Sequence, residues 1–208
     1  MTTVERVTVA APTRRRPVSV ALIRPNTIVL PKSFSWYGPV PPIGLAYVAA
    51  VLRDAGHRVT VVDSAGEAID RVVDVESPVG TLRQCGLPVE EIVARLPADT
   101  ELVGITHMFL HEWPHVREIA EAVRERFPDA FIVCGGENAT GYHRWMFDQT
   151  DAVDACVLGE GERTALAVAE CLAQGRPVEA MEGLALRRPP NGDDGDGPGG
   201  LRPRITTR

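Results

Sequence analysis

The sequence predicts one doubly wound α/β domain with a mainly parallel sheet of about five strands, and three observations support this. Short apolar runs, often β-branched, alternate along the chain with stretches whose apolar residues recur at helical spacing. The runs contain few polar residues, as expected for strands covered by helices on both faces. The chain has 208 residues, of which 44% are hydrophobic, which is enough for one filled core. Strands that alternate with helices favour parallel pairing through right-handed crossovers.

Five apolar runs are expected to form the strands, at residues 18–23, 59–62, 102–106, 131–134 and 155–158. Helical periods occupy residues 43–51, 89–96, 116–127 and 162–173. Pro41-Pro42 marks the start of the first helix, Gly56 its end, and Pro114 the start of the third. Residues 65–73 are a further candidate helix, whereas residues 74–88 have no clear assignment.

Composition changes near both ends of the chain. Residues 1–17, with the basic cluster Arg14-Arg15-Arg16, are expected to form a flexible lead, and residues 18–187 the folded domain. Residues 188–208 are expected to form a Gly/Pro/Asp-rich linker or part of an edge hairpin. In the hairpin, residues 201–205 would pair with residues 184–187.

Charge and cysteine content exclude several classes of protein. The net charge of -6 gives no general attraction for nucleic acids or anionic membranes. No apolar stretch approaches the roughly 18 residues of a membrane helix, so a cytoplasmic protein is expected. The four cysteines show no CxxC or similar metal-ligand spacing. Cys134 and Cys156 lie in apolar runs, where buried structural thiols are expected.

In a doubly wound sheet, ligands bind beyond the carboxyl ends of the strands. One such place begins with Gly135 and Gly136, which follow a predicted strand and present backbone without a Cβ atom. Asn138 and Thr140 add an amide and a hydroxyl that could hydrogen-bond a polar ligand. The double glycine by itself is also compatible with a simple tight turn.

A second candidate loop contains Gly159, Glu160, Gly161 and Glu162. Its glycines would let backbone N–H groups approach a ligand, and Glu162 would lie in a first helical turn, where negative charge is favoured. The alternative is an ordinary helix start. Two acids would repel phosphate, and neither glycine loop matches GxxxxGK[ST] or GxGxxG.

Two further segments leave the ends of predicted strands. His107, His111 and His115 are spaced by four residues, which on one helix would align them for zinc. Pro114 favours a helix start after His107 and His111, so we expect the loop to present apolar and aromatic groups to a flat ligand. The long segment from Arg24 to Gly44 carries Phe34, Trp36 and Tyr37, which would form either a lid or packing over the sheet edge.

Five elements in order resemble the N-terminal cobalamin-binding domain of cobalamin-dependent radical-SAM enzymes, a class that includes many methyltransferases. They are Pro41-Pro42-Ile43-Gly44-Leu45-Ala46-Tyr47 with Leu52 and Gly56 behind it, Val61-Val62-Asp63, Val103-Gly104-Ile105-Thr106, Gly135-Gly136-Glu137-Asn138-Ala139-Thr140, and Gly159-Glu160-Gly161-Glu162. The resemblance covers residues 18–187.

The resemblance implies a flavodoxin-like (Rossmann-type) sheet with cobalamin on its carboxyl edge. Thr106, His107, Met108 and Phe109 would lie under the corrin ring. Along the nucleotide tail the resemblance would place Gly135, Gly136, Glu137, Asn138, Ala139, Thr140, Gly159, Glu160, Gly161 and Glu162. Classical methylcobalamin proteins carry DxHxxG after the first strand, whose histidine binds cobalt. Arg24-Pro25-Asn26 stands there instead, so we expect no protein histidine on the metal.

In such enzymes cobalamin accepts a methyl group from S-adenosylmethionine and passes it to a small-molecule or peptide substrate. The accompanying radical chemistry requires a 4Fe-4S cluster held by CxxxCxxC, and this chain has no such motif. We therefore expect a cofactor-binding part without catalytic residues of its own, served by a radical-SAM barrel in cis or in trans.

Two alternatives remain open at the level of sequence. One is the nucleotide- or sugar-nucleotide-binding half of a transferase, in which double-glycine loops also follow parallel strands. The other is a cofactor-free, flavodoxin-like interaction domain. A receiver domain of that shape is disfavoured because Arg24 and His107 stand where its acidic residues are needed.

Overall fold

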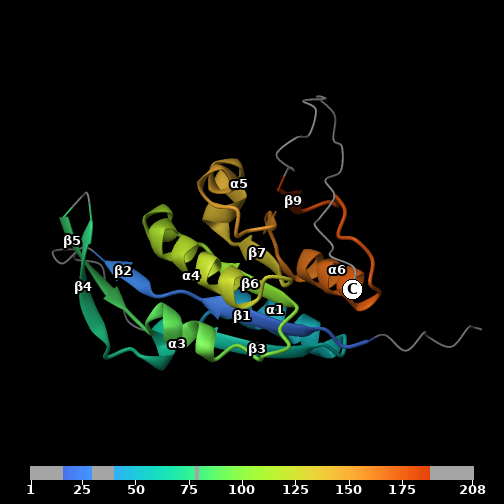
Figure 1. The fold of residues 1–208 in the computed structure, drawn as a ribbon, viewed down its shortest axis with the longest axis horizontal. Coiled ribbons are helices and arrows are strands. Elements are labelled where there is room, and N and C mark those ends of the chain that lie inside the picture. The colour runs from blue at the N-terminus through green and yellow to red at the C-terminus, as the bar shows by residue number, and fades with distance from the viewer. Residues whose placement is uncertain (1–15, 30–39, 78–79, 188–208) are drawn as a thin grey trace, which may run out of the picture.

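The computed structural model describes residues 16–29, 40–77 and 80–187, which form two sheets with helices on both faces of the larger one (Figure 1). The larger sheet has six strands in the order β3-β1-β6-β7-β8-β9. Five of them are parallel: β1 (Ser19–Arg24), β3 (Arg58–Asp63), β6 (Leu102–Thr106), β7 (Phe131–Gly135) and β8 (Ala155–Val157). Strand β9 (Leu184–Leu186) pairs with β8 in the antiparallel direction.

This architecture confirms the predicted doubly wound α/β fold. The five predicted parallel strands are present, and their order along the sheet is second, first, third, fourth, fifth, which is the flavodoxin-like order. The chain reverses its direction of travel across the sheet between β1 and β6. The predicted edge strand at 184–187 is β9, whereas its proposed partner at 201–205 lies outside the described residues.

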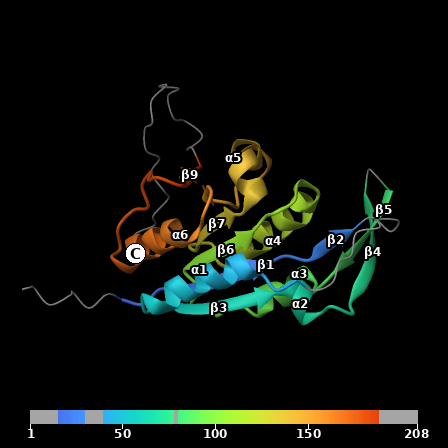
Figure 2. The same ribbon diagram turned by 180° about the vertical axis from the view of Figure 1, so that it is seen from behind.

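Helices cover both faces of the large sheet, as Figures 1 and 2 show from opposite sides. Helices α1 (Ile43–Asp54) and α6 (Glu162–Ala173) lie on one face. The other face carries α3 (Val89–Ala94), α4 (Trp113–Arg126) and α5 (Glu137–Gln149). Alternate residues of each strand point to opposite faces, so Val20 and Leu22 pack towards α1 while Ala21 and Ile23 pack towards α4.

Local sequence explains where the first helix begins and ends. Pro42 precedes α1, where its missing N–H group costs no hydrogen bond. Leu45, Ala49 and Leu52 form the buried stripe of the helix. Gly56 follows with φ of +90°, a conformation that ends helices and that glycine adopts without strain.

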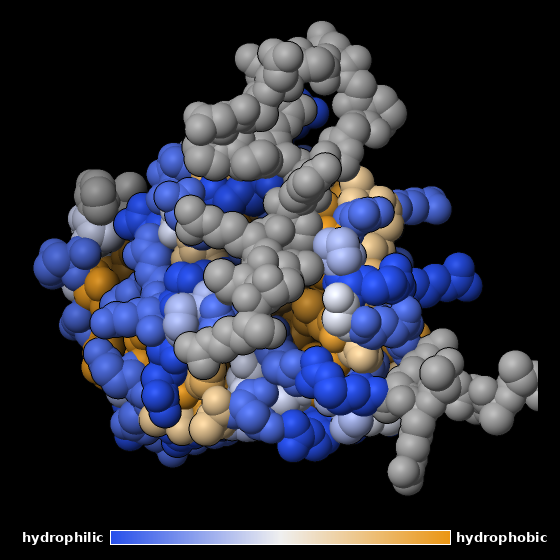
Figure 3. Space-filling view, turned by 45° about the vertical axis from the view of Figure 1, so that its right-hand side comes forward, coloured by the Kyte–Doolittle hydropathy of each residue, from blue (hydrophilic) through white to orange (hydrophobic). Residues whose placement is uncertain are grey.

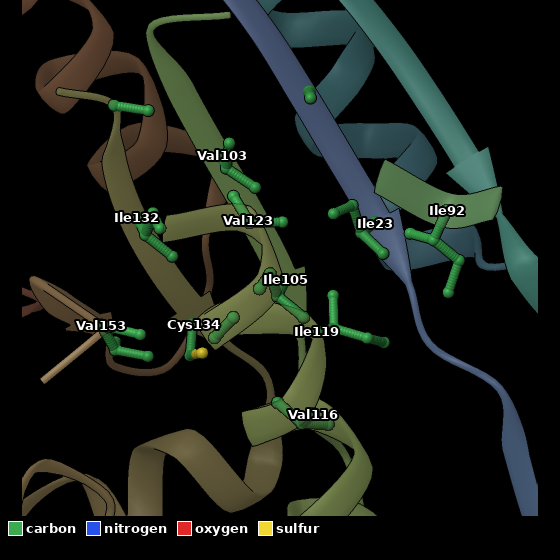
Figure 4. Packing of buried hydrophobic residues seen from close by; sticks show 14 of the residues in the cluster. Ile23, Ile92, Val103, Ile105, Val116, Ile119, Val123, Ile132, Cys134 and Val153 are labelled. Carbon is green, nitrogen blue, oxygen red and sulfur yellow. The ribbon is translucent and has the colours of Figure 1, made fainter. Parts of the chain in front are cut away.

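The core on the α4 side of the sheet is a continuous apolar layer. Figure 4 shows side chains from β6, β7 and α4 converging in it. Ile105 and Ile132 from the sheet and Val116 and Ile119 from α4 have at most 1% of their surface exposed. Close packing of this kind makes the loss of even a few methyl groups costly.

A second, three-stranded sheet extends beyond the carboxyl end of β1 (Figure 1). It contains β2 (Thr27–Val29), β5 (Gly80–Cys85) and β4 (Val72–Ser77), all antiparallel. The predicted helix at 65–73 is therefore wrong beyond α2 (Ser64–Glu67). The β-branched run that begins at Val72 pairs with β5 over its whole length, and this pairing overrides the weak local helical pattern.

Between residues 135 and 140 only Gly136 lies outside a strand or helix, because β7 ends at Gly135 and α5 begins at Glu137. We did not predict this helix from the sequence, although Ala139, Tyr142 and Met146 recur at i, i+3 and i+7. Ala139 and Met146 anchor it in the core, and non-helical angles at Tyr142 divide it into two parts. The predicted turn at 135–140 is thus corrected to a strand that ends at Gly135, a turn at Gly136 and a helix from Glu137.

The surface turned to the viewer in Figure 3 is mainly hydrophilic, with hydrophobic residues in separate patches. No helix within the described ranges is both long enough and apolar enough to cross a membrane.

We predict that Ile119→Ala lowers the free energy of unfolding by about 2–5 kcal/mol, because it leaves a cavity in the closed layer under α4. The matched control is Ile69→Ala at a side chain that is 41% exposed, which should cost less than about 1 kcal/mol. Urea denaturation of both variants measures the difference. Equal effects would mean that the α4 layer is not tightly packed.

Candidate functional site

A cavity of about 810 Å³ lies at the carboxyl edge of the large sheet, beside the reversal between β1 and β6. Its volume is in the range of small-molecule and cofactor sites. Each of the four segments that the sequence indicated contributes to its lining, represented by Arg24, Thr106, Gly135 and Gly159. The topology of the sheet brings them together because parallel strands all end at the same edge.

The floor of the cavity is the face of the sheet that looks towards α1 and α6. Leu22, Gly104 and Val133 lie side by side in the strand register, and all three line the cavity. The side chain of Leu22 occupies the space beside Gly104. A Cβ atom at Gly104 would lie only 2.8 Å from Cδ2 of Leu22. At Gly135 a Cβ atom would meet Cβ of Val157 at 3.7 Å, an ordinary contact distance.

Helices α1 and α6 form apolar walls above this floor, through Leu45, Val48 and Ala165. Part of the cavity is therefore a slot between the sheet and the two helices, lined by aliphatic groups and by glycine backbone. Such a slot suits a flat, weakly polar group, because removing the apolar surface of that group from water lowers the free energy of the complex.

The rim of the cavity is polar and rich in carboxylates. Glu137, Glu160 and Glu162 lie at the starts of α5 and α6. Across the cavity lies Arg24, whose Nη1 is 3.0 Å from Oδ1 of Asp63. Arg24 is the one Lys or Arg side chain among the described residues that line the cavity, and it is already paired.

Thr140 joins two of the predicted loops. Its hydroxyl donates to the carbonyl of Gly136 at 3.0 Å and accepts the N–H of Gly159 at 3.0 Å. Gly159 itself has φ of +70°, and no atom within 4 Å would meet a Cβ there. The hydroxyl therefore sets the position of the β8–α6 loop relative to the start of α5.

His107 joins another pair of loops from a buried position. Its backbone N–H donates to the carbonyl of Gly135 at 2.7 Å, and its carbonyl accepts the N–H of Asn138 at 3.1 Å. The imidazole Nε2 lies 2.9 Å from Nδ2 of Asn138, and the ring packs against Trp113 with centroids 5.3 Å apart. Burial lowers the pKa of His107 to about 4, so the ring is neutral at physiological pH.

All but three of the predicted cofactor-binding residues line the cavity. The three that do not are His107, Asn138 and Ala139, which are buried behind its wall with at most 6% of their surface exposed. Their displacement follows from the helix that begins at Glu137, since it turns Asn138 towards His107 and Ala139 into the core. Met108 and Phe109, by contrast, are about half exposed at the cavity mouth.

The three spaced histidines belong to three different elements. His107 lies in the loop after β6, His111 in the short 3-10 helix η1 (Leu110–Glu112), and His115 in α4 beside Gln84 and Glu118. Among the described residues, no group of three or more His, Cys, Asp or Glu side chains is arranged to hold a metal ion.

Glu112 is a residue of the cavity wall that the sequence did not single out. Burial raises the pKa of its carboxyl to about 7, although the backbone of Phe109 and the charge of Arg24 oppose the shift. The sequence also did not single out the walls formed by Leu45, Val48 and Ala165. Helical periodicity marks such residues as apolar without distinguishing a core residue from a cavity residue.

We predict that His107 makes the protein less stable in acid, by about 3 kcal/mol between pH 6.5 and 4. The folded-state pKa is below the unfolded value, so the unfolded chain binds more protons in this window and stability falls as the pH falls. His107→Gln should remove this part of the slope, and His143→Gln is the control. Glu112 contributes a slope of opposite sign in both proteins, so the difference between the two urea-denaturation series isolates His107.

Comparison with known proteins agrees with this geometry. The chain matches the family model of the B12 binding domain over residues 34–169. It is 28% identical over 202 residues to cytidylyl-2-hydroxyethylphosphonate methyltransferase of Streptomyces wedmorensis, covering 95% of this chain and 35% of that protein. It is 29% identical over 151 residues to anaerobic magnesium-protoporphyrin IX monomethyl ester cyclase of Synechocystis sp., covering 72% of this chain and 27% of that protein.

A third relative is hopanoid C-3 methylase of Methylococcus capsulatus, which is 27% identical over 168 residues, 80% of this chain and 28% of that protein. The chain thus spans about a third of the length of the relatives it matches. The family match covers most of the parallel sheet and both glycine loops. This chain therefore belongs to the B12-binding domain family.

Proposed function

We propose that this chain is the cobalamin-binding part of a radical-SAM enzyme that moves a methyl group from S-adenosylmethionine through cobalamin to a substrate. The observation that carries the proposal is the cavity itself, in which a slot floored by glycine and aliphatic side chains opens onto a polar rim. The names of two relatives, a methyltransferase and a methylase, support the methyl-transfer part.

The cavity fits the two parts of cobalamin. Its nucleotide tail ends in a flat aromatic base, for which the slot between the sheet, Leu45 and Val48 provides an apolar surface without side chains at Gly104 and Gly135. The corrin ring carries uncharged amide groups, for which the polar rim supplies hydrogen-bonding partners. Met108 and Phe109 would present soft apolar groups to the underside of the ring.

When bound, cobalamin supplies a cobalt ion that can carry a methyl group. The residues of this chain would hold and orient the cofactor and keep water from its protein-facing side. His107 is bonded to Asn138 inside the fold, and Nε2 of His111, which lines the cavity, lies 3.1 Å from the carbonyl of Ile28. These contacts support the expectation that the cobalt has no histidine ligand from this chain.

The rest of the reaction is assigned to protein outside this chain. A radical-SAM barrel, in cis or in trans, would bind S-adenosylmethionine and the 4Fe-4S cluster and would contact the substrate. The relatives are about three times as long as the part this chain matches, which leaves room for such a barrel in cis.

The charge of the rim disfavours a nucleotide- or sugar-nucleotide-binding transferase. Glu137, Glu160 and Glu162 occupy the loop ends where a diphosphate would lie, and Arg24 is engaged by Asp63. Repulsion between these acids and a diphosphate would weaken binding. Cobalamin carries one phosphodiester and a cationic metal centre, so it is less affected.

We predict that Gly135→Leu abolishes cobalamin retention. Protein mixed with hydroxocobalamin and desalted should keep the corrin absorption band in the wild type and lose it in the variant, because the new side chain projects into the slot. The control is Gly141→Leu on α5, where a Cβ atom meets nothing within 4 Å and the residue lies outside the cavity. Loss of colour from the wild type itself would refute the proposal.

Gly135 is a cleaner position for this test than Gly136. Gly136 has φ of +108°, and a Cβ atom there would lie 2.9 Å from the carbonyl oxygen of His107 and 2.8 Å from Sδ of Met108. A substitution at Gly136 would strain the backbone as well as the cavity. Loss of binding by such a variant would not separate a blocked site from a damaged fold.

We predict that Thr140→Val weakens cobalamin binding by roughly fivefold, because it removes the hydroxyl that links Gly136 to Gly159, an interaction worth about 1 kcal/mol. Thr140→Ser keeps the hydroxyl and should restore most of the affinity. Titration of each variant, followed by the corrin absorption band, measures the dissociation constants. Equal affinities for Thr140→Val and wild type would show that the loop holds its position without this link.

A further inference from the structure

Glu112 is an acid with an unusual place in the cavity wall. It ends the short helix η1, directly before α4, and lines the cavity together with Phe109 and His111. The residue is partly buried, and its backbone N–H donates to the carbonyl of Phe109 at 3.0 Å. Glu160, by contrast, is an exposed residue of the loop between β8 and α6.

No unpaired positive charge lies beside Glu112 among the described residues to compensate a negative charge on its carboxyl. Arg24 is the cation that acts on it, but the guanidinium of Arg24 is bonded to Asp63. The neighbouring His111 has its Nε2 at the carbonyl of Ile28, and His115 on α4 is paired with Gln84 and Glu118. The remaining ionisable groups that line the cavity are the carboxylates of Glu137, Glu160 and Glu162, so Arg24 and His111 are the only described lining residues that could carry a positive charge.

We propose that Glu112 enters the cofactor complex as a neutral carboxylic acid and donates its O–H to an uncharged oxygen acceptor of the ligand, such as an amide carbonyl of cobalamin. This inference rests on the proposed function and adds the protonation state and the hydrogen-bonding role of one residue to it. Glu112 is a binding residue in this proposal.

Desolvation gives the physical reason. Burial already raises the pKa of Glu112 to about 7 in the free protein. A ligand that covers the cavity removes more water from the carboxyl, which further favours the neutral form. A neutral acid has a donor for an amide carbonyl, whereas a carboxylate can only accept.

The proposal gives cobalamin binding a defined dependence on pH. Below about pH 7 Glu112 is already protonated in the free protein, and the affinity should be constant. Above about pH 7 binding requires uptake of one proton from solvent, so the dissociation constant should rise by about tenfold per pH unit. Cyanocobalamin is the suitable probe, because its cobalt-bound cyanide is not exchanged for water or hydroxide in this range.

The experiment measures the dissociation constant of the full chain for cyanocobalamin from about pH 6 to about pH 9 by equilibrium dialysis. Calorimetry at about pH 8 in two buffers of different ionisation enthalpy counts the protons taken up, and this measurement needs no variant. Glu112→Gln keeps the shape and an N–H donor, so it should bind with an affinity that does not change with pH. Glu125→Gln, at an exposed residue of α4 outside the cavity, is the control and should keep the wild-type dependence.

The outcomes separate this inference from the proposed function. Proton uptake by the wild type, together with its loss in Glu112→Gln and its retention in Glu125→Gln, supports the inference. Binding without proton uptake, or binding that strengthens as the pH rises, overturns it and leaves the proposed function intact. A pH dependence that survives in a folded Glu112→Gln protein also overturns it. No binding of cobalamin at any pH refutes the proposed function and the inference together.

Discussion

Parallel pairing of β1, β6 and β7 is the constraint on which the remaining structure depends. These strands are buried on both faces, so they need helices on both sides, and each connection must cross over the sheet. All their carboxyl ends then lie at one edge. Because the chain travels one way from β1 to β3 and the other way from β6 onwards, the loops at that edge part and leave the cavity.

Glycine converts this edge from a packed core into a binding surface. The alternate residues of β1, β6 and β7 that face α1 and α6 are apolar until the floor reaches Gly104 and Gly135. Glycine inside a strand costs roughly 0.5–1 kcal/mol in stability, because the unfolded chain is more flexible there. The buried layers on either side offset that cost, so the floor of the cavity can stay flat and open.

Two small hydrogen-bond networks connect the loops behind and beside the cavity. His107 and Asn138 bind the loop after β6 to the start of α5, and Thr140 binds α5 to the loop after β8. The first network contains a group that burial keeps in a defined state, the neutral imidazole of His107. Burial acts with the opposite sign on the acid Glu112, so the same physical effect suppresses charge on a base and on an acid at one edge of the sheet.

Sequence by itself determined the class of fold, the five parallel strands and the loops that meet at the cavity. These features follow from local patterns, since apolar runs, helical periods and proline or glycine boundaries are properties of neighbouring residues. The motif order was also enough to indicate the family. Only the tertiary structure decided that β4 and β5 are antiparallel strands, because Val72 is stabilised there by pairing with β5 rather than by its local neighbours.

The tertiary structure also decided which residues of the predicted loops reach the ligand. Asn138 and Ala139 looked available in a turn, but a helix anchored by Met146 turns them inwards, and His107 follows because it bonds to Asn138. The sequence did not single out Glu112. The folded structure places it in the cavity wall, where burial raises the pKa of its carboxyl. Burial and charge environment come from residues far apart in the chain, and no local pattern records them.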